Sequence, residues 1–459
     1  MARDRKSAAW GRRCWLACAC AVLAGSAIAA PLDLAQAWQA AVANDAQLRA
    51  ARATAEATRE RVPQAQAQLR PQVNLNVQRN RNELNSESPG LLGEPLQQHL
   101  FYSSGNDSLT VRQPLYRPQL TAQLRQARAL VANGEALLQE EEQRLVMRLT
   151  QAYLEALQAE EQLRLAGVQR TAYTAQLEAA RRGFAAGSGT RTDIDEAQAR
   201  LDLNTAQELE ARQSVDFARR QLALIIGQPV TELAAIDTER LPLAVPEPAR
   251  LEDWLARAET TSPEIRAAAA NVQAARHEVE RVQAGHYPTL DAVAQLTRSE
   301  SDNPTRVDTR YRQKTIGVQL NVPLYQGGLV QSQVRQALAD LERYESVLQG
   351  VRLDLASRVH REFRGVTEGI ARVRALEQAV RSSEQLVTSS RRSQQGGSRT
   401  LVDVLNAEQQ LGVARRDLAQ ARFSYLLSVV RLRALAGELT EASISDVNGW
   451  LRVGAAPRN

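Results

Sequence analysis

Four short segments of the chain alternate strictly between hydrophobic and polar residues. Residues 72–78 read QVNLNVQ, residues 108–112 read SLTVR, and every second residue of 290–296 and of 316–322 is Leu, Ile, Val or Ala. A period of two puts the apolar side chains on one face of an extended chain and the polar ones on the other. The sequence therefore predicts four amphipathic strands, near residues 71–84, 106–116, 288–300 and 311–323.

The stretch that follows each strand pair is helical in pattern. Pro is absent from residues 119–185 and 330–394, and Leu and Ala recur there every three or four residues. At about 1.5 Å per residue such helices reach on the order of 100 Å, far beyond an ordinary globular helix. Each runs into a Gly-rich turn, near 183–189 and 395–398, from which a second long helix returns. The pattern predicts two antiparallel helical hairpins of coiled-coil type.

The two halves of the chain repeat one another. Residues of the first half that recur 210 positions later, given as pairs, are Gly187 and Gly397, Asp193 and Asp403, Ala197 and Ala407, Leu201 and Leu411, and Gly227 and Gly437. This indicates a duplicated unit of helix, two strands, long helix, turn and helix. We predict a first repeat over 30–227, a proline-containing connecting segment over 228–262, a second repeat over 263–437 and a C-terminal tail over 438–459.

The first 29 residues have the form of a secretory signal peptide. Basic residues precede the apolar stretch 14–24, and AIA at 27–29 fits a cleavage site. All three cysteines lie within this segment, which excludes disulfides, thiol catalysis and cysteine-bound metals from the mature chain. No later stretch offers about 18 uninterrupted apolar residues, so no membrane-spanning helix is expected.

Charge and motifs argue against an enzyme and against a nucleic-acid partner. The net charge is +5, but Arg and Glu are interspersed and aromatics make up only 4% of the chain, so no basic block is interleaved with aromatics. His99, His277, His286 and His360 are scattered, and neither G-x-S-x-G nor G-x-x-x-x-G-K-[ST] occurs. We expect no catalytic site, no metal and no cofactor, so any energy must come from a partner protein.

The four strands could belong to one of two kinds of sheet. An alternating pattern is found more often in a half-buried sheet of a water-soluble protein. Their position between very long helices, with polar loops inside each pair, favours a transmembrane β-barrel instead. Four strands cannot close a barrel, because even the smallest need about eight. Three copies of the chain would supply twelve.

Three segments of the sequence resemble the TolC family of bacterial outer-membrane efflux and secretion channels. They are residues 319–337 (QLNVPLYQGGLVQSQVRQA), 397–407 (GSRTLVDVLNA) and 417–425 (DLAQARFSY). The resemblance implies a mainly α fold with a small β part. In this fold the helical hairpins of a homotrimer form a periplasmic α-barrel with an equatorial belt, and four strands per protomer build a 12-stranded barrel in outer-membrane lipid.

The same resemblance implies partners and a gate at the tip of the hairpins. A membrane-fusion adaptor and an ABC or proton-driven inner-membrane pump would dock there, at turns that contain Gly187, Gly189, Gly396 and Gly397. Asp403 matches a ring of acidic residues at the entrance, and Asn406 stands where a second acid is usual. Residues that match the latch between helix pairs are Arg399, Thr192 and Asp193, with Gln394 in place of its tyrosine.

A simpler explanation exists for the two tip aspartates. Asp193 and Asp403 stand early in their predicted helices, where a carboxylate interacts favourably with the helix dipole. Neither a gate nor a channel is needed for that role.

Three functions stay open at this stage. The chain could be the outer-membrane channel of a type I secretion system with an ABC transporter, or the same kind of channel serving a proton-driven efflux pump. The apparent lack of a lipidation motif favours the first. A soluble periplasmic coiled-coil scaffold or adaptor is the third, and the four strands argue against it.

Overall fold

The computed structural model describes residues 31–89, 94–236, 243–301, 309–438, 444 and 448–452. The predicted signal peptide (1–29) and most of the predicted tail (438–459) lie outside these residues. The chain divides into two compact units. We call Gln47–Glu142 with Ala258–Ser357 the sheet unit, and Met1–Ala46, Gln143–Arg257 and Arg358–Asn459 the hairpin unit.

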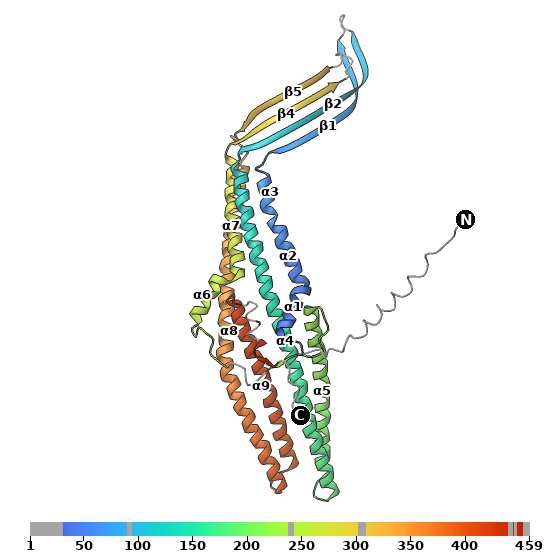
Figure 1. Ribbon diagram of the computed structural model, residues 1–459, viewed down its shortest axis with the longest axis vertical. Coiled ribbons are helices and arrows are strands. Elements are labelled where there is room, and N and C mark those ends of the chain that lie inside the picture. The colour runs from blue at the N-terminus through green and yellow to red at the C-terminus, as the bar shows by residue number, and fades with distance from the viewer. Residues whose placement is uncertain are drawn as a thin grey trace, which may run out of the picture. The chain divides into compact units, whose positions relative to one another are not determined.

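The sheet unit contains one antiparallel sheet of four strands in the order β1-β2-β4-β5 (Figure 1). The strands are β1 (Gln72–Pro89), β2 (Pro95–Tyr116), β4 (Thr289–Ser301) and β5 (Thr309–Asn321). The central pairing of β2 with β4 joins the two repeats and places Leu109 opposite Leu296. The four predicted strands are confirmed, and β4 and β5 begin and end within two residues of the prediction.

The first two strands are longer than their pattern predicts. The segment 82–107, expected as a polar loop, is largely strand, with Asn82 paired to Tyr102 and Leu84 to Leu100. In this outer half of the hairpin both faces are mostly polar, so a period of two leaves no hydrophobic contrast to read. Backbone pairing and side-chain hydrogen bonds, such as Asn82 Nδ2 to Ser104 Oγ at 2.9 Å, continue the ladder instead.

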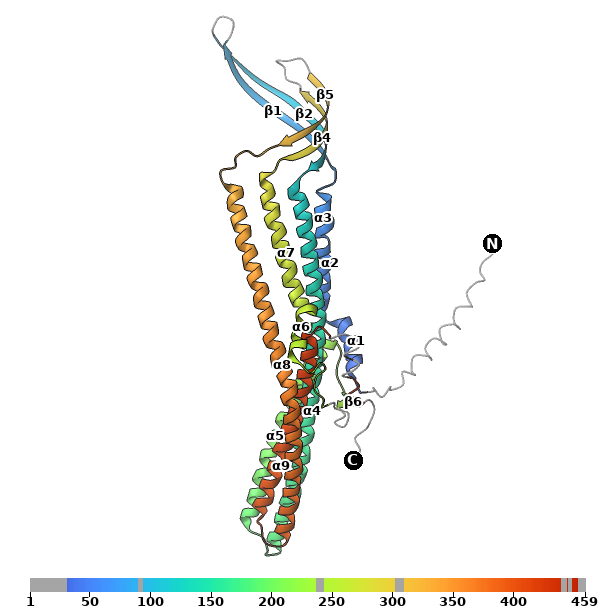
Figure 2. The ribbon, with the colours of Figure 1, turned by 90° about the vertical axis from the view of Figure 1, so that its left-hand side faces the viewer.

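Each strand of this sheet is joined to a helix at the same end. Four helices make these connections: α3 (Arg61–Ala67) precedes β1, α4 (Pro118–Ala185) follows β2, α7 (Pro263–Gln283) precedes β4 and α8 (Leu329–Gln395) follows β5. Helix α2 (Ala46–Arg59) lies before α3. The opposite ends of the two strand pairs, where Pro89 pairs with Pro95 and Ser301 with Thr309, therefore lie away from the helices (Figure 2).

One ion pair fixes the sheet to the start of α4. Arg117 donates through Nε to Oδ1 of Asp291 at 2.8 Å, and through Nη2 to the second oxygen of the same carboxylate. The Asp291 residue is only 3% exposed. A two-point Arg–carboxylate contact is directional as well as strong, so it sets the angle at which strand and helix meet.

The hairpin unit consists of two antiparallel helical hairpins, as predicted. The later part of α4 returns through α5 (Arg191–Ile226), and the later part of α8 returns through α9 (Leu401–Leu435). The two turns lie at the same end of this unit (Figures 1 and 2). Its remaining elements are α1 (Leu34–Asn44), α6 (Leu251–Thr261) as far as Arg257, β3 (Ala235–Ile236) and β6 (Leu451–Arg452). No helix in the described part of the chain combines enough length and hydrophobicity to cross a membrane.

A buried tyrosine fastens the N-terminal and connecting segments to α4. The Tyr153 side chain is fully buried, and its hydroxyl donates to the carbonyls of Leu32 at 2.9 Å and Ala234 at 3.2 Å. Leu32 also forms a parallel bridge with Leu233. Burial raises the pKa of the Tyr153 phenol well above its usual value of 10, so the hydroxyl stays a donor at any physiological pH.

Two glycines at hairpin ends give a matched test of packing. Gly227 and Gly397 have φ of 73° and 76°, but a Cβ on Gly227 would lie 2.7 Å from Asn44 Cβ, whereas nothing lies within 4 Å at Gly397. We expect Gly397→Ala to lower the free energy of unfolding by about 1 kcal/mol, because alanine is strained in a left-handed backbone conformation. Gly227→Ala should lower it by about 2–4 kcal/mol, because a clash with Asn44 is added to that strain. Thermal unfolding in detergent measures both, and equal shifts would contradict the assigned clash.

Candidate functional site

The two tip turns have the same construction. In the first, the amide of Ser188 donates to Gly183 O at 2.9 Å, and in the second the amide of Ser398 donates to Ser393 O at 2.9 Å. In each turn the residue just before the serine is a glycine with positive φ, as duplicated sequence predicts. Gly189 is further constrained, because a Cβ there would lie 3.0 Å from the Phe184 amide nitrogen. The turns are therefore compact and built largely by backbone.

Both tip aspartates cap the helices that leave the turns. Asp193 Oδ2 accepts from the Thr190 amide at 2.8 Å and hydroxyl at 2.7 Å, and the Asp193 amide donates to Thr190 Oγ1 at 3.2 Å. Asp403 and Thr400 repeat this geometry at 2.9, 2.7 and 3.3 Å. The simpler explanation from the sequence, a role at the helix start, is thus present at both sites. Such reciprocal boxes satisfy amides that have no helical partner.

The cap makes the Asp403 carboxyl more acidic. Hydrogen bonds from the Thr400 hydroxyl and amide, and the nearby Arg399 charge, hold its pKa below the usual value of 3.8. A group with a depressed folded pKa stabilises the fold above its unfolded pKa, and that stabilisation is lost as pH falls through the folded value. The first turn of α9 is therefore expected to loosen in acid.

Replacement of this carboxylate should reproduce the acid effect at neutral pH. In Asp403→Asn we expect faster hydrogen exchange than in wild type for the amides of residues 401–405 at pH 7, and a difference that shrinks as pH drops below about 4. Exchange rates corrected for the intrinsic pH dependence give the measurement. The capped start of α5 at Asp193 is the internal control, and a change of equal size there would contradict a local cap.

An apolar cluster lies just behind the tip turns and joins the two hairpins. Its members come from three helices: Tyr173, Leu177 and Ala180 of α4, Ala197 of α5, and Leu401 and Leu405 of α9. Burial raises the pKa of the Tyr173 phenol, whose oxygen accepts from Gln169 Nε2 at 2.9 Å. Since α9 begins inside this cluster, separation of the hairpins would expose apolar surface.

Arg200 makes a polar connection between the hairpins near the tip. It lies on α5 and donates through Nη2 to Asn406 Oδ1 on α9 at 3.2 Å, through Nη1 to Gln409 of the same helix, and through Nε to Glu196 at 3.0 Å. Sequence reasoning missed Arg200, although one signal was available: the duplication places Gln410, not a basic residue, at the matching position. Asn406 is the acceptor of this contact, and its place in a gate ring stays a prediction.

The residues predicted to form a latch are not joined to one another in a single chain. Arg399 Nη1 donates to Ser390 Oγ at 2.8 Å, within its own hairpin. The carbonyl of Gln394 accepts from the Gly397 amide at 2.9 Å, and Thr192 is exposed. Among the described residues, no hydrogen bond or ion pair connects Arg399 with Thr192 or Asp193. The latch between the helix pairs stays a prediction.

Buried carboxylates hold each hairpin together. Glu208 on α5 is 6% exposed and contacts Arg212 at 2.6 Å and Arg170 of α4 at 3.2 Å. Glu408 on α9 is similarly buried and pairs with Arg391 of α8. Removing one partner of such a pair leaves a buried charge, which is costly. These ion pairs connect the two helices within each hairpin, not one hairpin with the other.

The sheet presents one apolar and one polar face. The register places Val73, Val111, Ala294 and Ile316 in one row across the four strands, and Asn74, Thr110, Gln295 and Thr315 in the next. Ile316 is 89% exposed. Exposed apolar surface that continues across a whole sheet marks contact with lipid or protein rather than with water. Within the described residues, β1 and β5 pair on one side only.

Long helical hairpins that carry such a sheet define a class, the outer-membrane channel with a periplasmic helical part. The family model "Outer membrane efflux protein" matches residues 31–228 and 254–438. The chain belongs to this family, which confirms the TolC-family resemblance and places it in the outer membrane. The alternative of a soluble periplasmic scaffold is not supported.

Known proteins similar to this chain agree with that assignment. The proteases secretion protein PrtF of Dickeya chrysanthemi is 33% identical over 425 residues, covering 92% of this chain and 91% of PrtF. The alkaline protease secretion protein AprF of Pseudomonas aeruginosa is 32% identical, with 93% of this chain and 89% of AprF covered. The structure of the outer-membrane channel OprN matches with a TM-score of 0.77 at 19% identity, covering 88% of this chain and 90% of OprN.

Proposed function

We propose that three copies of this chain close one barrel and form the outer-membrane channel of a type I secretion system. An ABC transporter and a membrane-fusion adaptor would supply energy and docking, and the channel itself would conduct passively. The observation that carries the proposal is the sheet, with an apolar face and two edges that lack a partner among the described residues.

Barrel closure follows from backbone chemistry in lipid. An unpaired edge in hydrocarbon leaves amides and carbonyls unsatisfied, at several kcal/mol each, so a sheet in a membrane must close on itself. Four strands are too few to close. If β5 of one copy pairs with β1 of the next, three copies of four strands give twelve, with the apolar face outward and the polar face lining the lumen.

The tip is proposed to be the gate. Three Asp403 carboxylates around a threefold axis would concentrate negative potential at the entrance and favour cations. Asp403 is exposed and ionised at neutral pH, which supports this second role beside the cap. Because Asn406 is neutral, a second acidic ring is absent at that position. In planar bilayers, Asp403→Asn should shift the reversal potential towards weaker cation preference.

The proposed cargo is a secreted protein. PrtF and AprF, both named for protease secretion, cover nearly the full length of this chain. In the native host, deletion of the gene should remove at least one protein from the culture medium, and re-expression should restore it. Unchanged secretion together with new sensitivity to small toxic compounds would favour a channel for a proton-driven pump instead.

The oligomeric state tests the channel itself. The mature chain, extracted from outer membranes in detergent, should elute with a protein mass of about three times that of one chain, measured by light scattering with the detergent contribution subtracted. The full chain is 50.5 kDa before removal of the predicted signal peptide. A stable monomer, or a chain released from the periplasm without detergent, would overturn the proposal.

A further inference from the structure

Positive charge gathers on the apolar side of the sheet, not on its polar side. Beyond the apolar rows, successive rows on the same face run Leu75–Leu109–Leu296–Lys314, Val77–Asp107–Arg298–Arg312, Arg79–Gly105–Glu300–Arg310 and Arg81–Ser103. These rows hold six cations and two acids. On the opposite face of the described strands the charged residues are Arg112 and Asp291, one of each sign. We call the six cations the basic cluster: Arg79, Arg81, Arg298, Arg310, Arg312 and Lys314.

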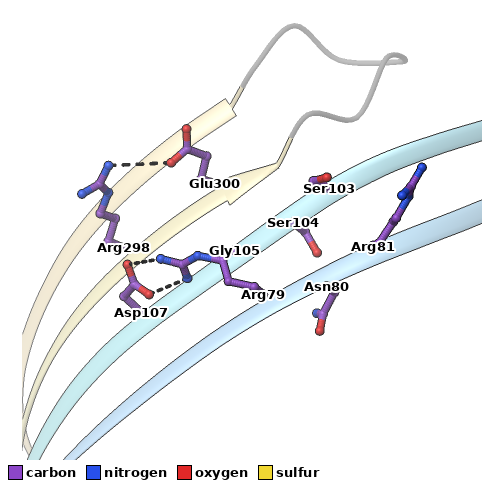
Figure 3. Close-up of a pocket in the computed structure, with 9 residues that line it drawn as sticks. All are labelled: Arg79, Asn80, Arg81, Ser103, Ser104, Gly105, Asp107, Arg298 and Glu300. Carbon is purple, nitrogen blue, oxygen red and sulfur yellow. Dashed lines mark hydrogen bonds and ion pairs between the residues drawn. The ribbon is translucent and has the colours of Figure 1, made fainter.

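A hollow lies beside three cations of this cluster, Arg79, Arg81 and Arg298. It has a volume of about 450 Å³ and is lined by residues of β1, β2 and β4, with Gly105 among them (Figure 3). The absence of a side chain at Gly105 leaves the surface open between Arg79 and Arg298. A Cβ at Gly105 would already lie 3.2 Å from Arg79 Nη1. A larger residue there would fill the hollow.

Ion pairs fix part of the cluster and leave the rest available. Arg79 Nη1 and Nη2 donate to the Asp107 carboxylate at 2.6 and 3.1 Å, as Figure 3 shows. Glu300 is contacted by Arg310 at 2.8 Å and by Arg298 at 3.7 Å. Arg81, Arg312 and Lys314 have no acidic partner among the described residues. Both acids are therefore neutralised. Arg81, which lines the hollow, keeps its positive charge uncompensated among the described residues, as do Arg312 and Lys314 on the neighbouring strand β5.

We propose that this hollow binds the phosphorylated headgroup of a membrane lipid. The inference rests on the proposed function, because it takes the apolar face to be the lipid-facing face of a barrel. The basic rows follow directly after the apolar rows. They lie towards the ends of the strand pairs that are away from the helices. They thus coincide with the headgroup layer of the outer leaflet. Guanidinium groups bind phosphate oxygens through two parallel, charge-assisted hydrogen bonds. Arg therefore suits a phosphate ligand better than Lys, whose ammonium group acts as a point charge.

The distribution of charge argues against two other roles. Cations that attracted cargo or set ion selectivity would lie on the lumen face, where Asn74, Thr110 and Gln295 are neutral. Cations that served only solubility would not border an apolar band, since charge beside hydrocarbon is costly unless it is compensated. A phosphate in the hollow supplies that compensation.

Native mass spectrometry of the purified full-length channel tests the site. The probes are diphosphorylated lipid A, its dephosphorylated counterpart and inorganic phosphate, added to wild type, Arg81→Gln, Arg298→Gln and the control Arg70→Gln. Arg70 lies two residues before β1, at the end of that strand that is joined to α3. We expect diphosphorylated lipid A to bind about tenfold more weakly to each variant of the hollow, with the control unchanged.

Each outcome bears on a different claim. Equal binding of the two lipids to wild type, or equal loss in all three variants, would overturn the site. Full displacement of the lipid by inorganic phosphate would show that a free ion, not a lipid, is the ligand, and would also overturn it. The same spectra report the mass of the complex. Trimers that do not distinguish the lipids leave the proposed channel intact, whereas a monomer would remove both the channel and this site.

Discussion

Ile316→Arg is expected to abolish the assembled channel. Ile316 is 89% exposed in the single chain, and its row neighbours on the sheet are apolar. If that face meets lipid, an arginine at mid-membrane costs about 2–4 kcal/mol, and three copies raise the cost to on the order of 10 kcal/mol per barrel. Heat-resistant oligomers on gels of outer membranes, and light scattering in detergent, give the measurement. Trimer should be replaced by aggregated or degraded monomer.

The adjacent residue provides the control. Thr315→Arg introduces the same side chain one position away, on the face that carries Gln295 and Thr110. A one-residue step in a strand changes the face, so this arginine would enter a water-filled lumen. Normal trimer with altered ion selectivity is expected. Equal loss of trimer in both variants would contradict the assignment of faces, and normal trimer in both would contradict the membrane location.

The sequence predicts the sheet wherever hydrophobic contrast exists. In β5 the alternation from Ile316 to Leu320 fixes both the strand and its apolar face. Farther out along β1 and β2, one face carries polar residues such as Asn82 and Ser104 and the other carries Glu83 and Ser103, so the pattern does not distinguish strand from loop. There the strand is maintained by pairing with its neighbour, which depends on register and cannot be read from one segment.

At the tip, too, some features can be predicted from the sequence and others cannot. The repeat of Gly187 as Gly397, and of Asp193 as Asp403, predicts two equivalent turns because each depends on local backbone and capping. The contact of Arg200 with Asn406 joins residues 206 apart in sequence and depends on how two helices align. No local pattern contains that alignment. Hence the caps are predictable from the sequence, whereas the contacts that hold the hairpins together are not.

Arg200→Ala is expected to open the channel. The change removes the donors to Asn406 and Gln409, the described polar contacts between α5 and α9 near the tip. At about 0.5–1.5 kcal/mol per hydrogen bond, two bonds in each of three protomers sum to on the order of 5 kcal/mol if the hairpins move together. That is enough to move a closed state towards an open one. We expect a several-fold higher single-channel conductance in planar bilayers.

Arg181→Ala is the matched control for this prediction. Arg181 donates to Gln198 at 3.4 Å within the α4–α5 hairpin, so its loss does not touch the contact between hairpins. Arg200→Lys should be intermediate, because the charge remains but the fork that reaches two acceptors is lost. The apolar cluster around Leu405 stays in place in all three variants, which keeps the fold intact. Equal conductance in Arg200→Ala and Arg181→Ala would show that the gate is held elsewhere, with the predicted latch residues Arg399 and Asp193 as the next to test.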